Sequence, residues 1–108
     1  MAKLRPYPPP IENTTISGDA AYTYNWSNGG GFHTTSFFEM NNCFVAYNYS
    51  KDNGGGIMFS TGDNGNGIIQ NTLIANNTSD GWGVEICVFH SQSTKLVNNT
   101  FAYNSSGI

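Results

Sequence analysis

The acidic residues are the first candidates for chemistry in this 108-residue chain, because paired carboxylates can act as general acid and base. Two carboxylates that cleave a glycosidic bond must lie about 5 to 9.5 Å apart on one face of a protein. Residues 63–67, DNGNG, are similar to the start of a calcium loop, but the carboxylates that would complete the loop are missing further along. We therefore expect a turn there, and no catalytic or metal-binding carboxylate. After residue 12 the acids are scattered, at Asp19, Glu39, Asp52, Asp63, Asp80 and Glu85.

Histidine, cysteine and arginine complete the reactive side chains. His33 and His90 each follow an apolar run, and neither has a Cys, Asp or Glu at a ligand-like spacing, so we expect solvated turn residues. Cys43 and Cys87 are separated by a distance in sequence that is not a multiple of the repeat described below, and this disfavours a disulfide. Arg5, the only arginine, lies in a proline-rich tail. The sequence predicts no catalytic residue, no metal site and no cofactor.

Asn-x-Ser/Thr acceptor sequences are more frequent than the composition alone would produce. One interpretation is surface glycosylation in a secretory pathway. The other is that a repeat places Asn and Ser two residues apart for structural reasons, in which case an Asn inside the fold could not carry a glycan. Both interpretations stay open. The acceptor residues are Asn13, Asn25, Asn48, Asn76, Asn77, Asn98 and Asn104.

These residues are positioned by a repeat, seen most clearly in residues 71–86, NTLIANNTSDGWGVEI. Related copies begin at Asn42 and Asn98, one on each side of it. A period of about 28 residues in a strand-like sequence predicts a solenoid. Stacked coils would bring the equivalent residues together, with the asparagines forming a ladder. The equivalent sets are Val45, Ile74 and Phe101; Ala46, Ala75 and Ala102; Asn48, Asn77 and Asn104; and Ser50, Ser79 and Ser106. Cys43 aligns with Thr72 and Thr100, which indicates a packing role.

Residues 13–41 are interpreted as a degenerate first coil. Ile16 takes the place of Val45, Ser17 that of Ala46 and Asp19 that of Asn48. A glycine step into an apolar residue follows each copy, at 56–57, 83–84 and 107–108, and in the first coil it comes late, at 29–32. The extra residues predict a longer loop, and such loops are where solenoids place binding surfaces. Its candidate sugar contacts are Tyr22, Tyr24 and Trp26.

The periodicity predicts an all-β fold. Residues 84–89 alternate with period 2, so Val84, Ile86 and Val88 should point inward. A second apolar run precedes each asparagine copy, at 37–40, 67–70 and 95–97. We expect two or three short strands in each coil and no helix, because no window has the apolar period of a helix. The predicted organisation is a Pro-rich N-terminal arm at 1–12 and a solenoid of three to four coils at 13–108.

Two features of the repeat carry a resemblance to known families: Gly55-Gly56-Ile57 and the apolar-x-x-Asn pattern of residues 101–104, FAYN. The pattern resembles the right-handed parallel β-helix repeats of pectate lyases and polygalacturonases, and it is also similar to the repeats of polymorphic autotransporter adhesins. The resemblance implies a right-handed parallel β-helix. Enzymes of this fold use bound calcium with an arginine base, or clustered aspartates, on acidic polysaccharides. Neither set can be placed on this sequence residue by residue.

The composition limits the kinds of partner that the chain could bind. Charged residues make up 10% of the chain and the net charge is −3, which disfavours nucleic acid because phosphate contacts need clustered Lys and Arg. No apolar run approaches the roughly 18 residues that a membrane span needs. The N-terminus is not a recognisable signal peptide, so an extracellular or cell-surface protein would have lost its leader or be a piece of a longer chain.

The sequence favours a structural role over catalysis. Our first hypothesis is an extracellular fibre or surface layer in which β-helical subunits stack head to tail as a homopolymer. Its predicted interface is Ile16 and Phe32 at one end and Phe101 and Ile108 at the other. The alternative is a fragment of a larger carbohydrate-active or adhesive β-helix that binds polysaccharide.

Overall fold

The structure, a computed structural model, describes residues 10–21, 29–35, 37–59, 66–88 and 93–106. The described residues form fifteen short strands and no helix. Sheet A contains β1 (Ile11–Glu12), β5 (Phe38–Asn41), β9 (Asn66–Gln70) and β13 (Ser93–Val97). Sheet B contains β2 (Thr15–Ser17), β6 (Phe44–Ala46), β10 (Leu73–Ala75) and β14 (Thr100–Ala102). Sheet C contains β3 (Ala20–Ala21), β7 (Tyr49–Ser50), β11 (Thr78–Ser79) and β15 (Ser105–Ser106). Sheet D contains β4 (Phe32–Thr34), β8 (Ile57–Phe59) and β12 (Ile86–Val88).

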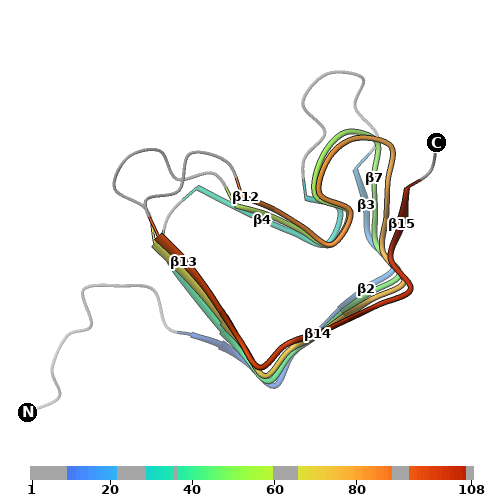
Figure 1. The fold of residues 1–108 in the computed structure, drawn as a ribbon. Coiled ribbons are helices and arrows are strands. Elements are labelled where there is room, and N and C mark those ends of the chain that lie inside the picture. Colours follow the sequence, from blue (N-terminus) through green and yellow to red (C-terminus); the bar gives the residue numbers. More distant parts are fainter. Residues whose placement is uncertain (1–9, 22–28, 36, 60–65, 89–92, 107–108) are drawn as a thin grey trace, which may run out of the picture.

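The chain visits the four sheets in the same order in every turn, and each strand pairs in parallel with its equivalent one turn away. The fold is therefore a parallel β-helix, as the repeat predicts. Figure 1 looks along the stack with the C-terminal coil nearest, and that coil runs anticlockwise from β13 through β14 to β15 as it approaches the viewer, which makes the helix right-handed. The described part holds three coils of four strands and a fourth of three strands.

The predicted register is confirmed in sheets B and C. Ala46, Ala75 and Ala102 are cross-strand partners, and so are Ser50 and Ser79. The first coil joins in the predicted place, since Ile16 pairs with Val45 and Ser17 with Ala46. The expected number of strands, two or three in each coil, is wrong, because the first three coils each contain four.

The predicted glycine step is partly wrong. Phe32 pairs with Ile57 as expected, but Ile57 pairs with Ile86 and not with Val84. Val84 precedes β12, so the inward alternation holds for Ile86 and does not extend back to Val84. The physical reason is crowding: a Cβ on Gly55 would lie 2.7 Å from the carbonyl oxygen of Val84, in the next coil. Among the described residues no strand of sheet D lies beyond β12, so the carbonyl that Val84 places above Gly55 has no counterpart above Val84 itself.

The core lies between sheets A, B and D, which enclose the interior seen in Figure 1. The inward columns of the middle coils are fully buried, for example Met40 with Ile69 and Val45 with Ile74. Gly67 leaves room for an aromatic ring, because a Cβ there would be 2.6 Å from Cε1 of Phe38. The Phe38 ring packs edge-on against Phe59, with 4.7 Å between the centroids. The largest fully buried side chains are Phe59, Met40, Ile57, Ile69, Ile74 and Val45.

The corners of the coil use left-handed backbone, which is costly for most residues and tolerated by Gly and Asn. At the corner between sheets A and B the asparagines Asn13, Asn42, Asn71 and Asn98 have φ of 50° to 55°. At the corner between sheets B and C, Gly18 and Asn76 alternate with Tyr47 and Tyr103, which are unusual residues for positive φ. Asparagine therefore recurs for two reasons: Asn13, Asn42, Asn71 and Asn98 form a turn, whereas the predicted ladder uses other asparagines. Residues 1–9 of the predicted arm lie outside the described part, and Ile11–Glu12 at its end forms β1.

Candidate functional site

The asparagine ladder runs along the inside of the corner between sheets B and C. Asn48 and Asn77 are buried, and Oδ1 of Asn77 accepts hydrogen bonds from the backbone N–H and from Nδ2 of Asn48, both at 3.1 Å. Oδ1 of Asn104 accepts the same pair from Asn77, at 2.9 Å and 3.0 Å. Each Nδ2 also donates to a backbone carbonyl of the preceding coil, for example from Asn77 to Val45 at 3.0 Å. The predicted ladder is present, and its amide oxygens all accept from the coil that precedes them.

A second polar column follows the corner between sheets A and B, inside the coil. The backbone N–H of Cys43 donates to Oγ1 of Thr72 at 3.3 Å, and the N–H of Thr72 donates to Oδ1 of Asn99 at 3.0 Å. The partner of Thr72 in the last coil is therefore Asn99, and the alignment with Thr100 is wrong by one residue. Leu73 is the residue that pairs with Thr100. Cys43 is buried in this column, and its thiol donates to the carbonyl of Asn41 at 3.3 Å.

The C-terminal end of the described stack exposes residues from the inward columns. Leu96, the partner of fully buried Ile69, is 49% exposed, and Phe101, the partner of fully buried Ile74, is 43% exposed. Val88, the partner of buried Phe59, is likewise 43% exposed. These three side chains form what we call the C-terminal face. Phe101 lies on it as the sequence predicts, whereas Ile108 lies outside the described residues.

The first coil presents the opposite end, which we call the N-terminal face. Ile11, Ile16 and Phe32 are half-buried and pack against the core from that side. Ile16 and Phe32 therefore lie at the end of the stack, where the sequence analysis places them. They belong to β2 and β4, whose free edges face away from β6 and β8.

The glycosylation acceptors occupy very different positions. Asn48 and Asn77 are buried and each Nδ2 uses both hydrogens in the ladder, so a glycan on these two nitrogens is incompatible with it. Asn104 is half-buried and its Nδ2 donates to the carbonyl of Ile74, so glycosylation of Asn104 stays a prediction. Asn13 and Asn98 lie at the corner between sheets A and B, and Asn76 is half-buried at the next corner. Asn25 lies outside the described residues. Glycosylation of Asn13, Asn76 and Asn98 stays a prediction.

The residues with reactive side chains do not converge in the described part of the chain. His33 is exposed in the middle of β4, so it is a strand residue and not the turn residue that we expected. Asp80 accepts a hydrogen bond from the hydroxyl of Tyr49 at 2.7 Å. Both cysteines are free, and burial, followed by the nearby Asp52 carboxylate, raises the pKa of the Cys87 thiol. Among the described residues no group of three or more His, Cys, Asp or Glu could hold a metal ion.

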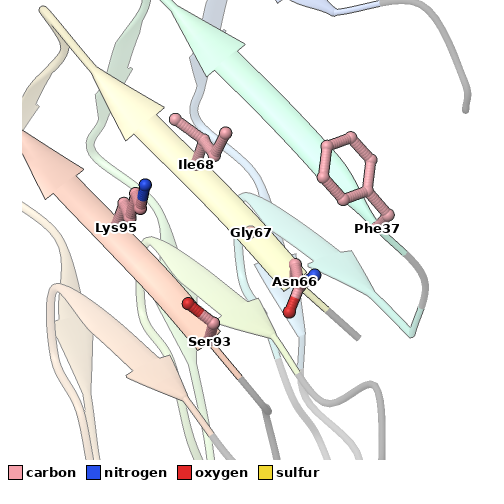
Figure 2. Close-up of a pocket in the computed structure, with 6 residues that line it drawn as sticks. All are labelled: Phe37, Asn66, Gly67, Ile68, Ser93 and Lys95. Carbon is pink, nitrogen blue, oxygen red and sulfur yellow. The ribbon is translucent and has the colours of Figure 1, made fainter. Parts of the chain in front are cut away.

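A shallow depression of about 250 Å³ lies on the outer face of sheet A. Figure 2 shows that Phe37, Ile68 and Lys95 rise from three neighbouring strand segments, with Asn66 and Ser93 at the starts of β9 and β13. Gly67 forms its floor. The depression combines one aromatic ring with amide, hydroxyl and ammonium groups. Sequence reasoning missed it, because Phe37, the residues 66–68 and the pair Ser93 and Lys95 come together only across neighbouring strand segments.

The predicted sugar contacts Tyr22, Tyr24 and Trp26 lie outside the described residues, as do His90 and residues 63–65 of the predicted turn at 63–67. Asn66 and Gly67, the last two residues of that turn, instead begin β9, so the turn is wrong there. In the part of the chain that the structure covers, no helix is long and apolar enough to cross a membrane. Comparison with family models, with curated proteins and with solved structures finds no match to this chain. The fold and the exposed ends of its stack are therefore the observations from which a function is inferred.

Proposed function

We propose that this chain is a structural, non-catalytic β-helical subunit that stacks end to end with further copies of itself into an extracellular fibre or surface layer. The observation that carries the proposal is the C-terminal face. Leu96 and Phe101 continue columns whose members one coil earlier are fully buried, yet they are 49% and 43% exposed. The half-buried Ile11 and Ile16 on the N-terminal face offer the matching columns of a second copy.

Stacking would satisfy two kinds of group at once. Apolar side chains would leave water, at about 25 cal/mol for each Å² removed. The outer edge of β14 would also gain a strand partner, and the edge strand of a sheet is a known template for association. The joint is head to tail, so each added copy presents a new C-terminal face and the assembly grows as a filament.

The test uses two neighbouring residues of β13. Leu96 and Val97 are 49% and 50% exposed, but Leu96 points inward in register with buried Ile69, whereas Val97 points outward in register with Gln70. Leu96→Lys would bury an unpaired ammonium in each joint, while Val97→Lys places the same charge on the side of the stack.

Filament formation would be followed by electron microscopy and by analytical ultracentrifugation across a concentration series, with circular dichroism to show that both variants fold. We expect wild type and Val97→Lys to form filaments and Leu96→Lys to stay monomeric. A wild-type chain that remains a monodisperse monomer at about 100 µM, a concentration at which a joint worth roughly 6 kcal/mol would be populated, contradicts the proposal. So do filaments that form equally well with Leu96→Lys.

A second candidate function, polysaccharide binding by a fragment of a larger carbohydrate-active or adhesive protein, is favoured by the depression on sheet A. An aromatic ring beside hydroxyl, amide and ammonium groups suits a sugar, which has apolar faces and polar edges. Titration of the chain with acidic and neutral oligosaccharides by NMR would test it. Shifts confined to Phe37, Asn66, Ser93 and Lys95 that disappear in Phe37→Ala support this candidate, and an unchanged spectrum removes it.

A further inference from the structure

The asparagine ladder has different chemistry at its two ends. Inside the stack each Nδ2 donates twice, to a carbonyl of the preceding coil and to Oδ1 of the next coil. In the last coil Nδ2 of Asn104 donates to the carbonyl of Ile74 at 3.0 Å, and no coil among the described residues lies beyond it to receive the second hydrogen. The backbone N–H of Asn104 is in the same situation. The equivalent N–H groups of Asn48 and Asn77 both donate to Oδ1 of the next coil, and no next coil is described for Asn104. The C-terminal end of the ladder therefore offers two donors.

The N-terminal end offers acceptors. The ladder position of the first coil is Asp19, whose backbone N–H donates to Oδ1 of Asn48 at 3.0 Å. Asp19 is exposed, and it occupies the ladder position at which each asparagine of the later coils uses Oδ1 to accept from the coil before it. A carboxylate can only accept, and it accepts more strongly than an amide oxygen. Aspartate therefore replaces asparagine at the one rung where no preceding coil is described.

The second polar column repeats this polarity. Its N–H groups also donate forward, from Cys43 to Thr72 and from Thr72 to Asn99. The N–H of Asn99 is thus a forward-pointing donor at the C-terminal end. At the N-terminal end Thr14 gives its hydroxyl hydrogen to the carbonyl of Glu12 at 2.7 Å, which leaves Oγ1 as an acceptor.

A single register matches all of these groups. Placing the first coil of one copy on the last coil of another sets Leu96 opposite Ile11 and Phe101 opposite Ile16, and it sets Asn99 opposite Thr14 and Asn104 opposite Asp19. All four pairs share one sequence offset, because the coil-to-coil steps along the stack add up to the same total in sheet A as in sheet B. Apolar groups then meet apolar groups, and the forward-pointing donors of Asn99 and Asn104 meet acceptors. The second carboxylate oxygen of Asp19 takes the place of an asparagine Nδ2, which inside the stack donates to a carbonyl of the preceding coil, so this oxygen gains no donor from the carbonyl of Phe101.

Sheet D does not pair across the joint among the described residues. Its last strand, β12, belongs to the third coil, and the fourth coil lies between β12 and the β4 of the next copy. The side chains at that edge agree with such a gap. Val84 and Glu85 stand where the second coil has Gly55 and Gly56, and a Cβ on either glycine would lie within 2.7 Å of a carbonyl oxygen of the next coil. In this register the next copy brings no described sheet D strand to the level directly above Val84 and Glu85, so the carbonyl oxygens that Val84 and Glu85 place above Gly55 and Gly56 have no described counterpart there.

We propose that the joint is made in this register, with Asp19 of one copy capping the asparagine ladder of another by accepting hydrogen bonds from the backbone N–H and Nδ2 of Asn104. This inference rests on the proposed end-to-end stacking and adds its partner surface, register and polarity. The polarity excludes the other pairings: two N-terminal faces would oppose carboxylate to carboxylate, and two C-terminal faces would oppose donor to donor. All subunits of a filament therefore point the same way.

The test blocks one face at a time. Asp19→Lys replaces the acceptor with a charged donor on an exposed residue, and Phe101→Lys blocks the opposite face. Asp19→Ala removes the acceptor without adding charge, and we expect it to raise the concentration needed for assembly about tenfold, which corresponds to one charge-assisted hydrogen bond. Glu12→Lys is the matched control, because Glu12 is an exposed acid on the outward side of the same coil, in register with outward-facing Asn41.

Mixing gives the decisive result. Asp19→Lys alone and Phe101→Lys alone should both be monomeric, while Glu12→Lys should assemble. An equimolar mixture of the two blocked proteins retains one intact C-terminal face and one intact N-terminal face, so it should form heterodimers and nothing longer. A mixture that stays monomeric overturns the head-to-tail pairing.

Disulfide trapping tests the register itself. The double variant Asp19→Cys with Asn104→Cys, in a Cys87→Ser background, should form intermolecular disulfides under mild oxidation, because neighbouring rungs are about 4.8 Å apart and a disulfide needs about 4.4 to 6.8 Å between Cα atoms. Ala21→Cys with Asn104→Cys, two residues out of register, should not. If wild type assembles but Asp19→Lys assembles equally well and no crosslink forms, the register is wrong while stacking survives. If wild type does not assemble, both proposals fail.

Discussion

Removing one amide from the middle of the asparagine ladder should cost far more than removing the same amide from its end. Asn77 is fully buried and takes part in four side-chain hydrogen bonds. Asn77→Ala leaves three groups without their partner: the backbone N–H of Asn48, one hydrogen of Asn48 Nδ2 and the carbonyl of Val45. Each stranded buried group costs about 1 to 3 kcal/mol, so the free energy of unfolding should fall by roughly 3 to 9 kcal/mol.

Asn104→Ala is the matched control. It deletes the same side chain from the same column, and it strands the N–H and one Nδ2 hydrogen of Asn77 together with the carbonyl of Ile74. Asn104 is only half-buried in the last described coil, so water can replace its amide. We expect a loss of about 1 kcal/mol.

Urea denaturation followed by circular dichroism measures both losses, at a protein concentration low enough to exclude assembly. Because a small domain is typically stable by only about 5 to 15 kcal/mol, Asn77→Ala should be largely unfolded or have a much lower midpoint, while Asn104→Ala stays folded. Equal losses for the two variants, or a loss below about 1 kcal/mol for Asn77→Ala, would refute the reasoning that burial makes the ladder strong.

The remaining predictions concern the core, one corner and one thiol. Ile69→Ala should destabilise the chain by about 2 to 5 kcal/mol and Leu96→Ala by about 1 kcal/mol, because they share a column but only Ile69 is fully buried; urea midpoints will show whether the order holds. Tyr47→Asn should stabilise by about 0.5 to 1 kcal/mol, since Tyr47 is 63% exposed with φ of 60°, and an unchanged or lower melting temperature would count against it. The rate at which iodoacetamide modifies Cys87 should rise with pH, with a midpoint above the ordinary thiol pKa of 9.0 in the folded chain and near 9.0 in urea. The raised pKa also makes stability depend on pH. The thiol's contribution to the free energy of unfolding is unchanged below pH 9.0 and falls as the pH rises further, because the Cys87 thiol ionises at lower pH in the unfolded chain than in the folded chain.

The fold and the register in sheets B and C could be predicted because their columns use the same residue types in every coil. The ladder demands an amide at Asn48, Asn77 and Asn104, and Ala46 and Ala75 are buried cross-strand partners close to it in sequence. Such positions recur in the sequence because stacking repeats their environment.

The glycine step and the ends could not be predicted in the same way. Glycine recurs for two reasons, left-handed φ at Gly54 and Gly83 and a close approach of the next coil at Gly55 and Gly56. The second reason disappears in the last complete coil, so the visible motif moves by two residues and misleads the alignment. Asp19 looked like a degraded repeat residue, and only the direction of the ladder's hydrogen bonds reveals that it is the acceptor end.

The spacing of the coils has a kinetic consequence. Residues that pair between neighbouring coils are separated in sequence by one coil length, and this separation does not grow with the number of coils. Loop closure therefore costs nearly the same entropy for each coil that folds onto the stack, and the costly event is the first pairing, before any strand has a neighbour on both sides. A joint between two copies closes no loop and is opposed by the lost translational and rotational freedom of a whole subunit. The number of coils in one chain is consequently fixed by its sequence, whereas the length of a fibre built from copies would depend on the concentration of the protein.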